Sequence, residues 1–232
     1  IVHQNFPGQF RQLVPWLQQA GHEITAICSH ERPLMPAIRI MRYAAPSHPD
    51  LTMTTSQQIC HEAFARAELV AFLAESLRVE GWYPDLILAH SGWGESLGLA
   101  EVFPKAPFIV WPELWVRPEH GGHGTDPELP FPGLTERLEQ LGRNAITRLA
   151  LEQASVWVLP TFHQARSLPM EFQQDGLQVI HEGIDTNLAV PNHEMSFSVR
   201  GVLIDRSVPV ITFVNRSLER LRGFDVFMSS LP

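Results

Sequence analysis

Short apolar runs alternate with longer stretches of helical periodicity along most of this 232-residue chain. The apolar runs predict strands, and the regular spacing of apolar residues between them predicts helices. Strands separated by helices in this repeated order indicate a parallel sheet with helices on both faces. The runs are continuous rather than alternating, which is typical of strands that are covered on both sides. The sequence therefore predicts an α/β fold.

The same pattern places each element. We expect a strand stub at Ile1–His3 and strands at Glu23–Cys28, Ile38–Tyr43, Leu86–Ala89, Phe108–Trp111, Val156–Leu159, Gln178–Ile180 and Val208–Val214. We expect helices from Phe10 to about Gly21, interrupted by Pro15, and at Ser56–Glu80, Leu134–Ala154, Phe162–Phe172 and Gly223–Leu231. The core candidates of the longest helix include Ile59, Phe64, Leu69, Phe72 and Leu77.

Two stretches lack any periodicity. Pro112–Gly133 is rich in Gly, Pro and charge, so it is interpreted as a functional or a disordered loop. Val190–Ser207 is polar and rich in turn residues, which indicates a linker. The strand and helix expected after it would begin a second unit.

Composition excludes several classes of function. The chain carries 17 Lys and Arg against 25 Asp and Glu, a net charge of -8, so it offers no basic face for a nucleic acid. No apolar run approaches the roughly 18–20 residues that span a bilayer. Cys28 and Cys60 are too few for a disulfide framework and wrongly spaced for a metal site, so we expect a reducing, cytoplasmic compartment. The chain does not begin with Met, and we expect residues before Ile1.

Ligands of an open parallel sheet bind beyond the carboxyl ends of its strands. Gly8 follows the first strand and either lets the backbone approach a phosphate or simply closes a tight turn. His90 stands at the end of another strand, where it either exchanges protons with a hydroxyl substrate or serves the structure. Trp93 either stacks on a sugar ring or packs in the core.

Two other motifs near these positions suggest different chemistry. Gly94–Gly98 matches G-x-S-x-G, the nucleophile elbow of esterases, with Ser96 as the nucleophile. The elbow requires the strand to run straight into the serine, but the strand ends near His90, so we expect Ser96 in the first turn of a helix. His120 and His123 lie among carboxylates, yet the glycines between them provide no scaffold for a metal, and we expect a mobile acceptor-binding loop.

Near the C-terminal end, Arg216 and Arg222 follow the last expected strand and precede the last expected helix, which Gly223 opens. Two guanidinium groups beside a helix N-terminus are suited to a pyrophosphate.

Together these segments resemble the retaining glycosyltransferases of family 4, which have the GT-B architecture of two facing Rossmann-like domains. The similar segments, which occur in the family's order, are Val2–Phe10, His90–Leu97, Pro112–Trp115, Asp126–Glu128, Arg143–Asn144, Pro160–Gln164, His181–Thr186 and Arg216–Gly223. The resemblance implies a Rossmann-like acceptor-binding domain over residues 1–189, an interdomain linker at 190–207, and the first β–α unit of a nucleotide-sugar-binding domain at 208–232. The chain alone would then be inactive, because most of the donor domain lies outside it.

The resemblance also implies a reaction, the transfer of a sugar from a nucleotide-diphosphate sugar to a hydroxyl of a carbohydrate or lipid-linked acceptor, with retained configuration. Gly8, Arg216 and Arg222 would bind the donor diphosphate, although many relatives have Lys where this chain has Arg222. His90 would be catalytic. We expect Trp93, Glu95 and Glu113 to bind the acceptor, and neither a metal nor a cofactor to be needed.

Three alternatives stay open at this stage. The first is a serine esterase of the α/β-hydrolase type that uses Ser96. The second is a non-catalytic domain that binds a sugar or nucleotide. The third is a sugar-nucleotide epimerase that shares the GT-B architecture.

Overall fold

The structure is a computed structural model that describes residues 1–30, 35–45, 52–124, 126, 128–207 and 209–231. The chain divides into two compact units, residues 1–183 and 184–232. The strands of the first unit are β1 Ile24–Cys28, β2 Ile38–Arg42, β3 Ile87–His90, β4 Phe108–Trp111, β5 Val156–Leu159 and β6 Leu177–Val179. Its helices are α1 Leu13–Gln19, α2 Thr55–Val79, α3 Leu99–Val102, α4 Leu134–Gln153 and α5 Phe162–Ser167, with 3-10 turns η1 Gly8–Arg11, η2 Pro118–Gly121 and η3 Met170–Phe172.

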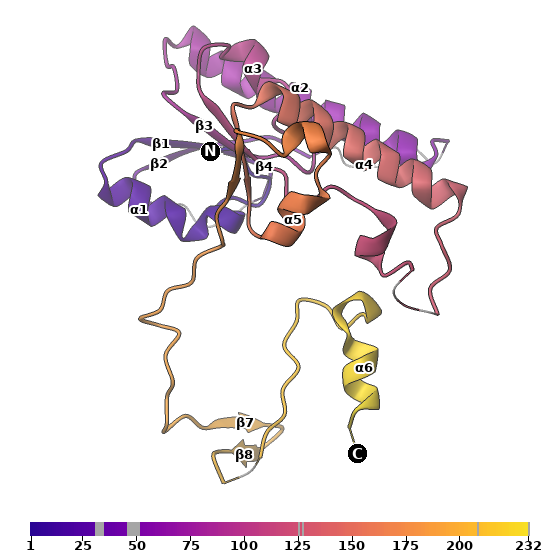
Figure 1. Ribbon diagram of the computed structural model, residues 1–232. Coiled ribbons are helices and arrows are strands. Elements are labelled where there is room, and N and C mark those ends of the chain that lie inside the picture. Colours follow the sequence, from indigo (N-terminus) through magenta and orange to yellow (C-terminus); the bar gives the residue numbers. More distant parts are fainter. Residues whose placement is uncertain (31–34, 46–51, 125, 127, 208, 232) are drawn as a thin grey trace. The chain divides into compact units, whose positions relative to one another are not determined.

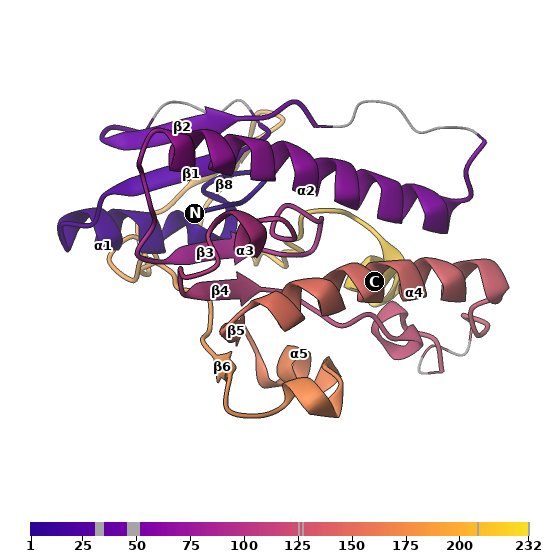
Figure 2. The ribbon, with the colours of Figure 1, turned by 90° about the horizontal axis from the view of Figure 1, so that it is seen from above.

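All strand pairs of this unit are parallel. β1 pairs with β2, and β3 to β6 pair in the order of the chain. Val2 forms parallel bridges to Ile27 of β1 and to Ala89 of β3, so the segment before β1 lies between the two groups of strands. The order across the sheet is therefore β2, β1, the Val2 segment, β3, β4, β5 and β6 (Figure 2).

Helices cover both faces of this sheet (Figure 1). Ala26 and Cys28 of β1 belong to a core that contains Val14 of α1, whereas Ile27 between them belongs to a core that contains Val70 of α2. Alternate residues of one strand point to opposite faces, so every residue of β1 is buried. The predicted α/β, Rossmann-like parallel sheet with helices on both faces is confirmed.

The core face of α2 differs from the prediction. The buried residues of this helix are Ala63, Ala67, Val70, Ala74 and Leu77. Phe64 is 50% and Phe72 is 72% exposed, so their assignment to the core was wrong. The small residues face inward because the chain after β3 packs directly on the helix. A Cβ added at Gly94 would lie 2.3 Å from the carbonyl oxygen of Ala63, which leaves no room for a large side chain there.

Two shorter helices also differ from the prediction. The helix expected from Phe10 is preceded by η1, and α1 itself begins only at Leu13. Pro15 therefore lies in the first turn of α1, where proline is tolerated, and does not interrupt the helix. The helix expected over Phe162–Phe172 is divided into α5 and η3. Leu168 has φ -60° and ψ 149°, the extended conformation favoured before a proline, and this ends α5 ahead of Pro169.

The second unit contains a hairpin of β7 Phe197–Val199 and β8 Val202–Ile204, then η4 Arg220–Arg222 and α6 Phe224–Ser229. The expected helix at its end is confirmed. The strand expected at Val208–Val214 is not formed: Val208 lies outside the described residues, and 209–214 contain no strand. No described strand of this unit pairs with that segment, and without a partner an extended chain forms no ladder. Val214 is accordingly 89% exposed.

Among the described residues, no helix combines the length and apolarity needed to cross a membrane.

Candidate active site at the carboxyl edge of the sheet

The candidate site lies where three neighbouring strand segments end. The segment that carries Val2 continues into His3, β3 ends at His90, and β4 ends at Trp111, directly before Pro112 and Glu113. His90 is opposite Trp111 in the register of β3 and β4. Because the three segments are parallel and adjacent, the residues that follow them meet at one edge of the sheet.

His90 and Glu113 form the centre of this site. Nε2 of His90 lies 3.2 Å from Oε1 of Glu113. The imidazole is 3% exposed, whereas the carboxylate side chain is 47% exposed. Glu113 has φ +61°, a backbone conformation that is uncommon for residues other than glycine and that recurs at functional sites. A buried imidazole therefore contacts a carboxylate that a substrate can reach.

Gln9 and His3 extend this pair into a chain of contacts. Gln9 Nε2 donates to Oε1 of Glu113, and Gln9 Oε1 accepts from Nε2 of His3. The backbone N–H of Asn5 donates to Nδ1 of His3 over 2.9 Å. An Nδ1 that accepts a hydrogen bond carries no proton, so the proton of a neutral His3 is on Nε2. The ring of His3 also lies 4.9 Å from the ring of His90, centroid to centroid.

Gly8 packs on this chain of contacts. Its φ is +49°, and a Cβ added to it would lie 2.3 Å from Nε2 of His3. Glycine is thus required here both for the backbone conformation and for the close approach to the imidazole. The structure brings Gly8, His90 and Glu113 of the predicted site into one cluster through His3 and Gln9.

Glu95 occupies a different environment from Glu113. It is 1% exposed and accepts a hydrogen bond of 2.9 Å from the hydroxyl of Tyr43. Burial and the neighbouring Glu95 raise the pKa of Tyr43 above its usual value, so this phenol remains protonated and continues to donate. Trp93, two residues earlier, is 41% exposed. Its carbonyl oxygen lies 3.5 Å from Nη1 of Arg66 on α2.

Ser96 does not form a nucleophile elbow. β3 ends six positions earlier, at His90, and Ser96 lies in the turns that precede α3 rather than in its first turn. The residue is 0% exposed, and no described group forms a hydrogen bond with its hydroxyl. A serine nucleophile needs a neighbouring base and access to substrate, and this serine has neither among the described residues.

The chain after Glu113 is held by α4 and α5. Asn144 of α4 accepts from the backbone N–H of Val116 and donates to its carbonyl oxygen, both over 2.8 Å. Arg117 donates two hydrogen bonds to the carbonyl oxygen of Ser167. These contacts fix the start of the segment that was expected to be a functional or a disordered loop.

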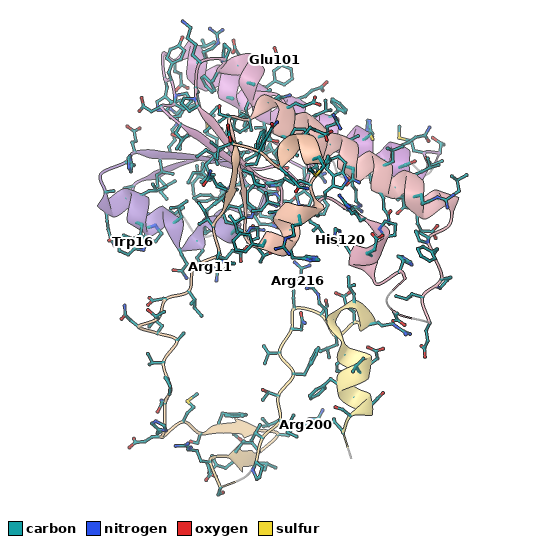
Figure 3. The ribbon with its side chains drawn as sticks, viewed as in Figure 1. Arg11, Trp16, Glu101, His120, Arg200 and Arg216 are labelled. Carbon is teal, nitrogen blue, oxygen red and sulfur yellow. The ribbon has the colours of Figure 1, made fainter. Side chains whose placement is uncertain are left out.

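Further along this segment, η2 carries His120 (Figure 3). Its ring lies 5.4 Å from that of His163, and burial together with the electrostatic effect of that neighbouring imidazole lowers the pKa of His120. No three His, Cys, Asp or Glu side chains of the described chain gather as metal ligands. Pro127, in the stretch Asp126–Glu128 that resembles the family, lies outside the described residues, as does Thr125 before it.

Arg216, which is labelled in Figure 3, and Arg222 belong to the second unit. Arg222 ends η4, and its Nε donates to Oε1 of Glu219 over 3.2 Å. Gly223, with φ +74°, follows and leads into α6. The two arginines are thus six residues apart around a tight turn.

Sequence reasoning missed several members of this site. His3 stands at the end of a strand segment in the same way as His90, so the same rule could have identified it. The sequence pattern placed Gln9 in a turn and Tyr43 at the end of a strand, but it gave neither residue a functional role. Asn144 belonged to a stretch similar to the family without an assigned role. Their contacts bridge 6 to 104 positions of the sequence, and no local pattern reports such contacts.

The sequence profile of the glycosyl transferase family 4 group matches residues 20–189. This range covers most of the chain and contains every strand of the parallel sheet, so the chain belongs to this family. It therefore carries the domain of a glycosyltransferase, a class of enzymes that act on a sugar donor and an acceptor. A search of the curated proteins finds no match.

Proposed function

We propose that the full-length protein transfers a sugar from a nucleotide-diphosphate sugar to a hydroxyl group of an acceptor, with retention of anomeric configuration. The observation that carries the proposal is the contact of 3.2 Å between His90 and Glu113 at the carboxyl edge of a sheet that belongs to a glycosyltransferase family. Parallel α/β sheets place their ligands at this edge.

In this proposal His90 is the catalytic residue and Glu113 binds the acceptor. The carboxylate of Glu113 is fixed by Gln9 and half exposed, so it can accept a hydrogen bond from the acceptor hydroxyl. His90 is held beside it in an almost fully buried position, where an imidazole can orient the reacting hydroxyl and exchange a proton with it. Trp93, which is 41% exposed, completes the acceptor side of the proposal, whereas Glu95 is 1% exposed and bonded to Tyr43, so it would act by holding this side in place rather than by contacting the acceptor.

Negative charge develops on the leaving diphosphate during transfer. Arg216 and Arg222 would neutralise this charge, and Gly8 would let the backbone of the first loop approach the phosphates. Positive side chains and backbone N–H groups that are already in place can stabilise such charge without a metal ion. We therefore propose a nucleotide-diphosphate sugar as co-substrate and no separate cofactor.

The test begins with a thermal-shift screen of the full-length protein against a panel of nucleotide-diphosphate sugars, because a ligand that binds only the native state raises the melting temperature. The donor that produces the largest shift is then incubated with candidate acceptors, and the anomeric configuration of the product is determined by NMR. Release of nucleoside diphosphate that depends on acceptor, with a product of unchanged configuration, supports the proposal. A product of inverted configuration contradicts it.

His90→Ala tests the assignment of the catalytic residue. A group that exchanges a proton in the transition state typically contributes about 10²–10⁴-fold to kcat, and we expect a loss within that range. His22→Ala is a matched control because it removes an exposed histidine between α1 and β1, outside the segments that resemble the family. A His90→Ala variant that retains its kcat would show that the imidazole is structural.

The same reactions separate the alternatives. An epimerase would convert the donor sugar when no acceptor is added. An esterase would be labelled at Ser96 by a fluorophosphonate, and the burial of that hydroxyl argues against labelling.

A further inference from the structure

A pocket of about 220 Å³ lies beside the His90 cluster. It is lined by residues of α2, of α4 and of the chain after β3. Gly92 forms part of its wall. A Cβ added to Gly92 would lie 3.1 Å from Cε1 of His90, so this part of the pocket wall packs against the imidazole. A ligand held here would be next to the proposed catalytic residue.

The loop that carries Trp93 is firmly seated. Gly94 has φ +99°, and a Cβ added to it would lie 2.3 Å from the carbonyl oxygen of Ala63 on α2. A Cβ added to Gly98 would lie 2.8 Å from Cβ of Ala71. The loop therefore rests directly on α2 through glycines, and this packing fixes the position at which Trp93 lines the pocket.

The charges around the pocket do not balance. Arg66 and Glu62 form an ion pair of 3.0 Å, and the arginine side chain is only 14% exposed. Arg143 of α4 also lines the pocket, and no described residue forms an ion pair or hydrogen bond with its guanidinium group. One positive charge thus faces the pocket without a partner from the described chain, and an arginine fork is suited to a carboxylate or a phosphate.

The size of the pocket limits what can enter. At about 30 Å³ for each water molecule in the liquid, its volume corresponds to about seven waters. That space accommodates one sugar ring. The exposed indole of Trp93 offers an apolar surface to the C–H face of such a ring, and Glu62 and Arg66 provide hydrogen-bonding groups for its hydroxyls.

We propose that this pocket binds one saccharide unit of the acceptor and that the unit bears an anionic group, which pairs with Arg143 while the ring stacks on Trp93. The inference rests on the proposed function, since it names the acceptor of that reaction. The anionic group is a carboxylate, as in a uronic acid, or a phosphate, as in a sugar phosphate.

The test measures binding without any nucleotide-sugar. Glucose, glucuronate and glucose 6-phosphate are titrated into the ¹⁵N-labelled chain, and the indole N–H signal of Trp93, assigned with Trp93→Phe, reports binding. A charge pair that is exposed or half exposed contributes little to the free energy of binding, and a charge-assisted hydrogen bond contributes somewhat more. We therefore expect at least one of the two anions to bind about threefold to tenfold more tightly than glucose.

Two variants locate the charge that is responsible. Arg143→Gln should reduce the preference for the anion to less than about twofold. Arg166→Gln removes an exposed arginine of α5 outside the pocket and should leave the preference unchanged. A preference for glucuronate alone selects a carboxylate, and a preference for glucose 6-phosphate alone selects a phosphate.

Three results would overturn the inference: equal binding of glucose and both anions, no perturbation of the Trp93 signal by any ligand, or equal losses in the two arginine variants. Failure of the proposed function is a separate outcome. A full-length protein that transfers no sugar, while the chain still binds the anion through Arg143, would refute the transferase proposal and leave the pocket assignment standing.

Discussion

Replacement of Gly8 by alanine is the sharpest test of how the candidate site is built. The new Cβ would lie 2.3 Å from Nε2 and 2.4 Å from Cε1 of the His3 ring, and φ at this position is +49°. The imidazole is 4% exposed and packs on His90, so it has little space into which it can move. We expect His3 to be displaced and its hydrogen bonds with Gln9 and Asn5 to be lost.

The cost follows from these two effects. A residue other than glycine in the left-handed region costs about 1 kcal/mol. Each of the two His3 hydrogen bonds contributes about 1 kcal/mol net. The free energy of unfolding should therefore fall by about 2–3 kcal/mol, which for a chain of this length lowers the melting temperature by roughly 5–10 °C.

The assay is urea unfolding followed by tryptophan fluorescence, with Gly21→Ala as the control. Gly21 has φ +86°, but a Cβ added there meets nothing within 4 Å, so that variant reports the backbone cost alone. Gly8→Ala should cost about 1–2 kcal/mol more than the control. In a His3→Ala background this excess should disappear, because the ring is no longer present. An equal cost in both glycine variants, or an excess that survives the loss of His3, would refute the reasoning.

Three further predictions concern neighbouring side chains. Ser96→Ala removes a buried hydroxyl that has no partner in the described chain, so the free energy of unfolding should rise or stay within about 0.5 kcal/mol of its value in the unchanged chain. A fall of more than about 1 kcal/mol, the net contribution of one hydrogen bond, would show that the hydroxyl has a partner. The raised pKa of Tyr43 means that the folded chain retains the phenolic proton, so stability is complete below about pH 10 and falls above it; Tyr43→Phe should flatten this fall in urea unfolding curves recorded from about pH 9 to 11. Asn144→Ala leaves two backbone groups of Val116 unpaired and should cost about 1–3 kcal/mol and speed proteolysis of the following segment, whereas unchanged proteolysis would mean that the segment is fixed elsewhere.

The sequence predicts an element well where local chemistry determines it. β4 has the predicted bounds, Phe108–Trp111, because prolines at 107 and 112 delimit its apolar run. The inward face of α2 could not be predicted, since both its alanines and its phenylalanines recur at helical spacing. Which set turns inward depends on Gly94 packing against Ala63, a contact between residues that are 31 positions apart.

The candidate site shows the same division. His90 could be identified because it ends a strand of a parallel sheet, and Glu113 because it follows the next one. Their contact depends on the register of β3 and β4, which sets His90 opposite Trp111 and is not visible in the residues themselves. The link from Glu113 to His3 through Gln9 depends in addition on where the turn before α1 is placed. The position of a residue at a strand end follows from the fold class, but which side chains contact one another depends on the three-dimensional structure of this particular chain.

The Val2 segment has a consequence for the integrity of the whole sheet. This segment consists of Ile1, Val2 and His3. On one side, the carbonyl oxygen of Val2 accepts from the N–H of His90, and the N–H of Val2 donates to Leu88. On the other side, the N–H of His3 donates to Ile27, and the carbonyl oxygen of Ile1 accepts from Ile27. Loss of these few residues would uncover the facing edges of β1 and β3 at once, and bare strand edges invite pairing with other chains. The same loss would remove His3 from the candidate site. A change in these residues would therefore promote association between chains and disturb the site at the same time.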